Sequence, residues 1–240
     1  MSGRPGFLAG FARRDGDLVE RMDDPNCDRD ALFRTYASFP AVNRVVAGWR
    51  HTYVNRLRPL FTGPTHTVLD IGAGGGDVAR ALIRWARDDG VRLDVTAIDP
   101  DERAAAYVAT LPPVDGFSYR RCSSTELADE GARFDFVVSN HVLHHLTATE
   151  LGTVLADSER LAVRAVLHSD IRRSAVAYLL FAVFTAVGFR GSFVQEDGLL
   201  SIRRSYLAGE LSGIVPPGWR VATLAPYRLL LIHERPSPDA

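Results

Sequence analysis

The chain has 240 residues, 46% of them hydrophobic, which is enough to build one globular domain around a sizeable core. Its formal net charge is −1 and all 28 basic residues are arginines, so it lacks the clustered basic excess of nucleic-acid-binding proteins. Cys27 and Cys122 are too few for a disulfide framework or a zinc motif, and we expect a cytoplasmic protein without nucleic-acid partners.

Residues 1–64 precede the first predicted strand and are expected to form an N-terminal helical cap. Apolar residues recur at helical spacing in two runs, at residues 32–39 and 42–53. Pro40 lies between the runs, and because proline lacks the N–H that a helix interior needs, we expect it to separate two helices. The prolines and glycine of residues 59–64 then predict a turn into the core.

Residues 68–79 are the most informative part of the sequence. Apolar residues and Asp70 lead into a run of glycines and then a helix-forming sequence, which predicts a strand, a tight turn and a helix. Glycine permits the positive φ of such a turn and lets a ligand lie against backbone N–H groups. A carboxylate at Asp70 would repel a pyrophosphate and attract an amino group or a sulfonium. A dinucleotide motif, G-x-G-x-x-A, can still be read from Gly74 to Ala79.

Further apolar runs predict the other strands of an α/β sheet. They span residues 91–99, 117–122, 134–140 and 165–170, and two short runs at 219–224 and 227–232 predict a terminal hairpin. Polar side chains end three of these runs: Asp99, then Ser139 with Asn140, then Asp170. Open α/β sheets bind ligands at the carboxyl ends of their strands, so these residues are candidate site residues.

Three histidines follow the strand at 134–140. In a helix, His141, His144 and His145 would occupy positions i, i+3 and i+4 and share a face. Three interpretations compete: a zinc site, which lacks a carboxylate at ligand spacing, structural packing of one histidine, and a general base for a phenol or alcohol proton. Asp170 can orient such a base across the cleft, or it can instead pair with a neighbouring arginine or cap a helix.

Residues 175–187 are the most apolar stretch of the sequence. They are fewer than the roughly 20 residues that a membrane-spanning helix needs, so no membrane span is predicted. A helix that is apolar all round must be buried between the sheet and a second partner. That partner can be an apolar substrate, a second copy of the chain, or residues 191–213, which carry a helical pattern of their own.

Together these segments carry a family resemblance. Residues 68–79 resemble the first motif of class I S-adenosylmethionine-dependent methyltransferases, and Asp99, the 134–140 strand and the LHHL segment at 143–146 match later motifs in register. The resemblance covers about residues 65–235 and is strongest to small-molecule O-methyltransferases. It implies an α/β, Rossmann-like, doubly wound sheet of seven mostly parallel strands with an antiparallel last strand. It also implies a helical cap at 1–64, substrate-covering helices inserted after the fifth strand, at about 174–213, and a tail at 236–240.

The resemblance implies S-adenosylmethionine as the cofactor. Asp99 matches the acid that binds the ribose hydroxyls. Ser123 stands where the family usually has an acid for the adenine, but it can equally cap the short helix that reaches Glu126. The implied cofactor-binding residues are Asp70, Gly72, Ala73, Gly74, Gly76, Asp77, Asp99, Pro100, Ser123, Ser139 and Asn140. The paired-histidine segment and strand-end acid of related enzymes implicate His144, His145 and Asp170 in catalysis, without a metal ion.

The resemblance also bears on the reaction. Amino- and base-directed methyltransferases carry an Asn-Pro-Pro-aromatic segment, whereas here Asn140 is followed by His141 and Val142. We therefore predict methylation of a hydroxyl on a small, largely apolar metabolite of secondary metabolism, such as an aromatic polyketide or a quinol, by a monomer or homodimer. C-methylation of such a substrate is the near alternative. A less favoured alternative is an NAD(P)-dependent oxidoreductase, based on the G-x-G-x-x-A dinucleotide motif that begins at Gly74.

Overall fold

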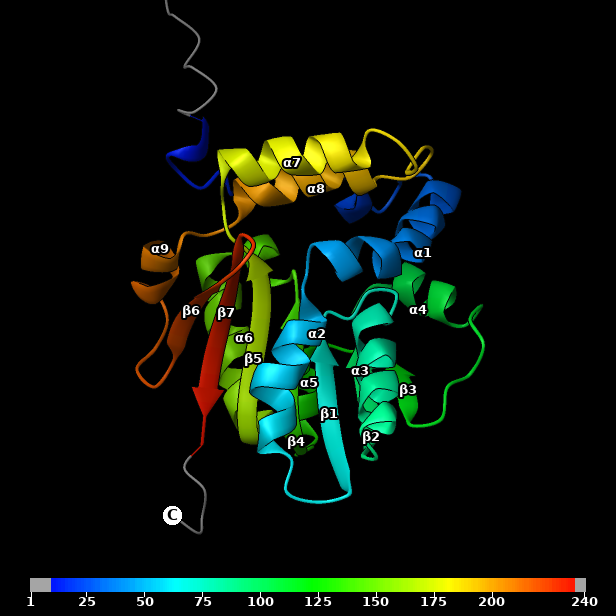
Figure 1. The fold of residues 1–240 in the computed structure, drawn as a ribbon, viewed down its shortest axis with the longest axis vertical. Helices are drawn as coiled ribbons and strands as arrows, with labels where there is room; N and C mark the ends of the chain where they lie inside the picture. Colours follow the sequence, from blue (N-terminus) through cyan, green and yellow to red (C-terminus); the bar gives the residue numbers. More distant parts are fainter. Residues whose placement is uncertain (1–9, 236–240) are drawn as a thin grey trace, which may run out of the picture.

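The computed structural model of the chain describes residues 10–235 (Figure 1). The predictions for residues 1–9 and for the tail at 236–240 lie outside the described residues. Within them, seven strands form one sheet in the order β3-β2-β1-β4-β5-β7-β6. The strands are β1 (Thr65–Ile71), β2 (Arg92–Ile98), β3 (Phe117–Arg120), β4 (Phe134–Asn140), β5 (Ala162–Ile171), β6 (Arg220–Leu224) and β7 (Arg228–Glu234). In this sheet β7 runs opposite to the other six strands, which confirms the predicted sheet.

Helices cover both faces of the sheet because its central strands are apolar on both faces. Val68 and Leu69, adjacent in β1, enter two different hydrophobic cores. The helices that flank the sheet are α2 (Trp49–Thr52), α3 (Asp77–Asp88), α4 (Glu102–Val108), α5 (Ser124–Asp129), α6 (Ala148–Leu161) and α9 (Ala208–Ser212). The segments α2 and α3 pack on the core that contains Val68, and α5, α6 and α9 pack on the core that contains Leu69. The predicted doubly wound architecture is confirmed.

The cap differs from its prediction at Pro40. Helix α1 (Arg29–Val45) continues through this proline, so Pro40 does not separate two helices. A proline in a helix interior removes one backbone hydrogen bond, but Tyr36 and Val42 are buried on either side of it and hold the helix in place. The chain instead turns at Gly48, whose φ of 56° lies in the left-handed region that glycine adopts readily.

The predicted insertion after the fifth strand is a pair of helices, α7 (Ala175–Thr185) and α8 (Val194–Arg204), which we call the lid. The lid helices pack against each other above the carboxyl ends of the strands, next to α1 (Figure 1). Phe181 and Ile202 of the lid share a hydrophobic cluster with Val42 of α1 and Ile171 of β5. Cap and lid therefore form one roof over this edge of the sheet. In residues 10–235, no helix has both the length and the apolar character needed to cross a bilayer.

The seam between the lid helices yields a stability prediction. A Cβ built on Gly198 of α8 would lie 2.3 Å from the Phe181 ring of α7. Gly198→Ala should therefore lower the free energy of unfolding by about 1–2 kcal/mol, because overpacking outweighs the better helix propensity of alanine. Gly152 of α6 is the control, since a Cβ there meets nothing within 4 Å among the described residues. Gly152→Ala should stabilise the protein by up to about 1 kcal/mol in urea unfolding. A Gly198→Ala protein as stable as Gly152→Ala would contradict the tight seam.

Candidate cofactor and substrate cleft

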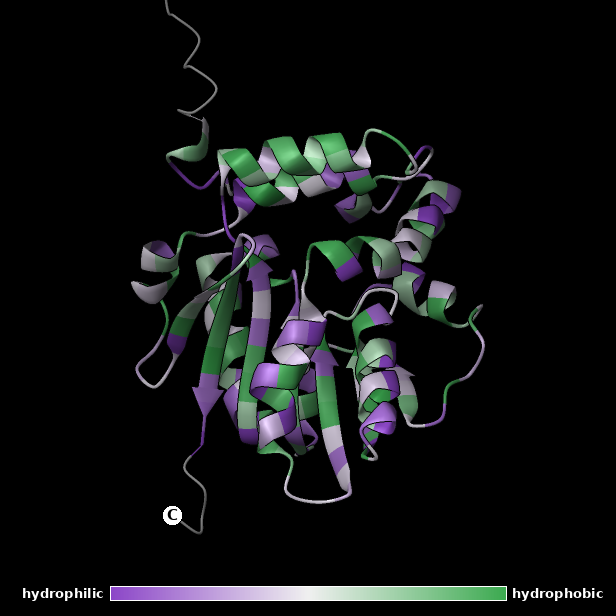
Figure 2. Cartoon of the chain, viewed as in Figure 1, coloured by the Kyte–Doolittle hydropathy of each residue, from purple (hydrophilic) through white to green (hydrophobic). Residues whose placement is uncertain are grey.

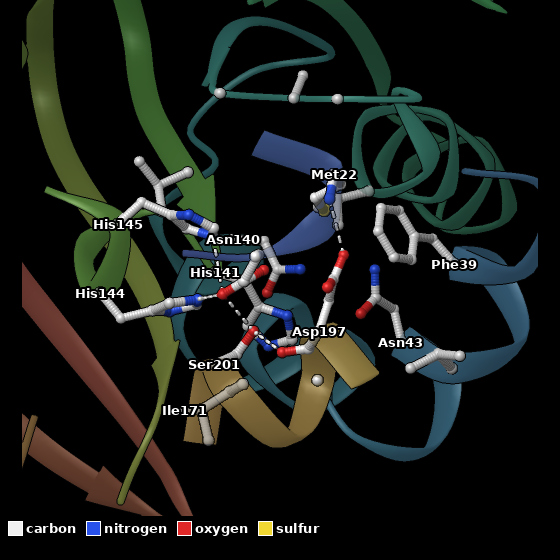
Figure 3. Close-up of a pocket in the computed structure, with 18 of the residues that line it drawn as sticks. Met22, Phe39, Asn43, Asn140, His141, His144, His145, Ile171, Asp197 and Ser201 are labelled. Carbon is white, nitrogen blue, oxygen red and sulfur yellow. Dashed lines mark hydrogen bonds and ion pairs between the residues drawn. The ribbon is translucent and has the colours of Figure 1, made fainter. Parts of the chain in front are cut away.

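A cleft of about 900 Å³ lies between the carboxyl edge of the sheet and the roof (Figure 3). One end is polar and is bounded by the loop between β1 and α3. The other end is apolar and lies under α1, α7 and α8, with side chains such as Phe39, Val42 and Phe181. Both ends open into one continuous space, so a polar ligand and an apolar ligand can lie side by side.

The glycine loop has the geometry that its sequence predicts. Gly72, Gly74 and Gly76 have φ values of 65°, 50° and 71°, which glycine adopts without strain. A Cβ on Gly72 would lie 2.7 Å from the Val142 side chain, so no larger residue fits there. The N–H of Ala73 donates to the carbonyl of Ile98 at 3.0 Å and ties the loop to β2. Gly72, Ala73 and Gly74 line the cleft, whereas Gly76 shapes the turn behind them.

Three carboxylates surround this loop. Asp99 accepts hydrogen bonds from the N–H groups of Gly74 and Asp101, both at 2.9 Å, and Asp77 accepts one from Asn43 at 2.9 Å. Asp70 is 1% exposed, and its Oδ2 has no hydrogen-bond partner among the described residues.

Burial raises the pKa of all three carboxyls, and the charges of Asp77 and Asp99 raise that of Asp70 further. None of the three carboxylates has an ion pair with a cationic side chain among the described residues. The polar end of the cleft therefore suits a ligand that carries an ammonium or sulfonium group, such as S-adenosylmethionine, and repels a pyrophosphate.

The other predicted cofactor residues are not all on the cleft. Pro100, Ser123 and Asn140 line it, and Asn140 Oδ1 is buried with no hydrogen-bond partner among the described residues. Ser139 is fully buried, and its hydroxyl lies 2.8 Å from His168 Nδ1. Successive side chains of a strand point to opposite faces, so the Ser139 side chain does not reach the cleft that Asn140 lines.

Ser123 is the N-cap of α5. Its Oγ accepts from the N–H of Glu126 at 3.2 Å, and its own N–H donates to the Glu126 carboxylate at 2.8 Å, which forms a capping box. This confirms the capping interpretation. Contact of Ser123 with the adenine stays a prediction.

The histidines do not share a helical face. His141 has a φ of 58°, and only Leu143–His145 form a short 3₁₀ turn (η5). The positive φ interrupts the helix that would have aligned the three rings. The carboxyl ends of β4 and β5 nevertheless bring His144 and Asp170 together, with 2.6 Å between His144 Nδ1 and Asp170 Oδ1. Asp170 thus pairs with a histidine and not with the neighbouring arginines, since Arg173 pairs with Glu210.

Glu20 completes the cluster from the segment before α1. Its Oε1 lies 3.6 Å from His144 Nε2 and 3.8 Å from His145 Nε2. Asp23 approaches the other side of His145, with 3.3 Å between its Oδ2 and His145 Nδ1. Sequence reasoning missed both acids, because they lie more than a hundred residues before the histidines and no local spacing connects them.

Charge is balanced within this cluster. Burial opposes the charge on His144, but Asp170 and Glu20 outweigh it and raise the pKa of His144 to about 9. In return, and against the effect of burial, His144 lowers the pKa of both Glu20 and Asp170. Arg204 adds a second cation, 3.5 Å from Glu20. Glu20, His144 and His145 offer ligand atoms within 4.8 Å of one another, but these cations already compensate the acids and we assign no metal ion.

His141 differs from its neighbours. Burial lowers its pKa to about 4, so the ring is neutral at physiological pH. Its Nε2 is buried and has no hydrogen-bond partner among the described residues, and the residue lines the cleft. His141 is therefore a neutral imidazole whose Nε2 is available for a hydrogen bond with a ligand in the cleft.

The described geometry agrees with a family match. Residues 68–164 match a family model described as a methyltransferase domain. The chain carries a class I S-adenosylmethionine-dependent methyltransferase domain.

This methyltransferase domain is similar to ubiquinone biosynthesis O-methyltransferases. That of Rhizobium leguminosarum bv. trifolii is 35% identical over 85 residues, which are 35% of this chain and 31% of the relative. The mitochondrial protein of Arabidopsis thaliana is 37% identical over 111 residues, 46% of this chain and 34% of the relative. The matches thus span about a third of these relatives.

Solved structures share the fold of the methyltransferase over most of its length. The plantazolicin methyltransferase BpumL in complex with SAH (S-adenosylhomocysteine) has a TM-score of 0.56 at 12% identity, over 86% of this chain and 95% of that chain. An O-methyltransferase family protein from Burkholderia thailandensis has a TM-score of 0.59 at 16% identity, over 91% of this chain and 62% of that chain. At such identities the likeness shows the fold alone.

The unpartnered carboxylate of Asp70 gives the second prediction. Asp70→Asn should stabilise the ligand-free protein by about 1 kcal/mol or more, since one pKa unit corresponds to about 1.4 kcal/mol. The gain should be present at neutral pH and absent below pH 4, where Asp70 is protonated in both the folded and unfolded states. The same change should weaken binding of S-adenosylmethionine by about tenfold in calorimetry. Asp88→Asn, at an exposed aspartate of α3, should change neither quantity. An Asp70→Asn protein that binds the cofactor normally would contradict the electrostatic role.

The His144 ion pairs predict a pH dependence of stability. Because the pKa of His144 is raised in the folded state, its contribution is fully present below pH 6.5 and is lost as the pH rises through about 9. Thermal and urea unfolding should show a loss of up to about 3 kcal/mol over this range. His144→Gln should remove the loss, and His51→Gln, at an exposed histidine on α2, should retain it. An unchanged pH profile in His144→Gln would mean that His144 is neutral in the folded protein.

Proposed function

We propose that the chain transfers the methyl group of S-adenosylmethionine to a hydroxyl oxygen of a small, largely apolar metabolite in the cytoplasm. One observation carries the proposal: a single cleft joins a glycine loop with three buried carboxylates to an apolar chamber bordered by imidazoles. When bound, the cofactor supplies an activated methyl group. The residues of the chain have to align the acceptor, exclude water and remove a proton.

The polar end of the cleft supports cofactor binding. We assign the ribose hydroxyls to Asp99, whose carboxylate is fixed at the end of β2 by two backbone N–H groups. We assign the positively charged part of the cofactor to the neighbourhood of Asp70, where a buried oxygen lacks a partner among the described residues. The remaining candidates that line the cleft are Gly72, Ala73, Gly74, Asp77, Pro100, Ser123 and Asn140. Ser139 drops out as a side-chain contact because its hydroxyl is bonded to His168.

The apolar end supports an apolar acceptor. Phe39, Val42 and Val46 of the cap region face Ile171, Leu180 and Phe181 across the chamber. Such a lining desolvates an aromatic or alkyl body and keeps water from the reacting atoms. The O-methyltransferase names of the curated relatives point to the same acceptor class.

We assign proton removal to His145, with His144 and Asp170 as the residues that position it. His144 is protonated between Asp170 and Glu20 and cannot accept a proton, but its ring lies against that of His145 with 4.3 Å between centroids and positions it. The His145 side chain is 27% exposed and borders the cleft, so we propose it as the acceptor of the hydroxyl proton. His141, which is neutral and has an unpartnered Nε2, is the second candidate for the general base, and the turnover experiment below compares the two histidines.

Two other reactions compete with O-methylation. C-methylation of an activated aromatic carbon would use the same cleft and imidazoles, and it is distinguished by the bond formed in the product. A nicotinamide-dependent reaction is disfavoured, because a pyrophosphate would place further negative charge beside three acidic side chains that have no cationic partner among the described residues.

The first test is ligand binding followed by turnover. S-adenosylhomocysteine at about 100 times its dissociation constant should add roughly 2.7 kcal/mol of stability, while NAD and NADP add none. With a panel of phenols and quinols, His145→Ala should lose about 10²-fold or more in turnover and keep its cofactor affinity. His51→Ala is the matched control. A larger loss in His141→Ala than in His145→Ala would move the base to His141, and stabilisation by NAD or NADP alone would overturn the proposed function.

A further inference from the structure

Helix α7 presents apolar side chains to solvent although its inner side is already packed. Its outer face, defined here as Val176, Leu179, Leu180 and Val183 together with Val187 in the turn that follows, is 52–79% exposed at each residue. These positions repeat at helical spacing and form one stripe. Figure 2 shows α7 as a continuously hydrophobic helix at the edge of the molecule. Contiguous exposed apolar patches mark interaction sites, whereas single exposed apolar residues do not.

The charged side chains of α7 and its flanking segments are all basic, and Glu196, the first acid after them, is paired with Arg21 at 2.9 Å. Residues 171–195 contain three arginines and neither aspartate nor glutamate. Arg173 is buried and pairs with Glu210, but Arg172 precedes α7 and exposed Arg190 follows it. Phe11 packs on Tyr178 near the start of the helix and brings the exposed Arg13 to the same end. Both ends of the apolar stripe are therefore basic.

We propose that the outer face of α7 docks on a lipid bilayer with anionic headgroups. An apolar stripe with basic ends is the pattern of a helix that lies in the membrane interface, with its apolar side in the acyl region. A second copy of the chain fits less well, because packing of two α7 helices in either direction brings arginines against arginines. Anionic headgroups complement both ends at once.

The cleft opens beside this docking surface. Leu180 and Phe184 are exposed on α7, and both also line the cleft. A lipid-soluble molecule can thus pass between the bilayer and the chamber while remaining in contact with apolar side chains. On the proposed function, this makes the acceptor a membrane-soluble phenol or quinol; the docking itself does not depend on methyl transfer.

Vesicle flotation tests the docking directly, with the full chain and without acceptor. The protein should float with vesicles of phosphatidylcholine and phosphatidylglycerol, and less with phosphatidylcholine alone or in high salt. Val183→Asp should reduce partitioning on the order of tenfold or more, because it places a charge in the apolar stripe. Val163→Asp, at another exposed valine, on β5 and away from the lid, should leave partitioning unchanged. Arg190→Gln should weaken binding to the anionic vesicles about fivefold, and exposed Arg133→Gln should not.

Two controls keep docking separate from folding and from catalysis. Each variant should retain its thermal stabilisation by S-adenosylhomocysteine, which shows that the fold and the polar end are intact. Failure of the wild-type chain to float with anionic vesicles overturns the docking and leaves the proposed function standing. A dimer in sedimentation that Val183→Asp dissociates also overturns it, since the stripe would then be the contact between two copies.

Discussion

The structure depends on the buried charge of His144. Its imidazolium lies between Asp170 at the end of β5 and Glu20 in the segment before α1, and Glu20 also accepts a hydrogen bond from Ser201 of the lid. Three parts of the chain that are far apart in sequence therefore meet at one ring. Removing any one partner leaves a buried charge uncompensated, so this network specifies how the N-terminal segment and the lid sit on the sheet. Apolar contacts alone would allow the cap and the lid to pack on the sheet in several ways. The ion pairs of His144 are satisfied in few of these arrangements.

The buried acids at the two ends of the cleft differ in their partners. Around His144 the acids have cations within the chain, and Arg204 adds to them. Around the glycine loop, Asp70, Asp77 and Asp99 have hydrogen bonds from neutral groups and no salt bridge within the described residues. The first arrangement stabilises the protein by itself. The buried carboxyls at the glycine loop destabilise the ligand-free protein, and a cationic ligand removes this destabilisation. The protein is thus less stable at the place where it has to bind the ligand.

Patterns that are local in sequence could be predicted, and contacts across the chain could not. The glycine loop and the strand ends follow from short-range periodicity, and two adjacent parallel strands bring His144 to Asp170. Pro40 was misjudged because the rule for proline in helices ignores the buried side chains on either side of it. Ser139 was placed on the cleft because its strand end was recognised without fixing which side chain points to which face. Glu20 was missed because only the folded chain brings it to the histidines.

The two lid helices form a rigid pair that is fastened at both ends. Gly198 meets Phe181 without room for a methyl group, so α7 and α8 cannot slide past each other and have to move together. The chain enters the lid at Arg173 and leaves it at Ser205, and the Arg173 guanidinium donates to the Ser205 carbonyl while its N–H donates to the carbonyl of Tyr206. Entry and exit are thus pinned to each other at one end of the lid. The far end, where residues 188–192 join the two helices, is tied to α1, since Arg34 Nε donates to the Gly191 carbonyl and the Phe193 N–H donates to Thr35 Oγ1. The lid is therefore held at both ends, and it covers the chamber together with α1 as one body.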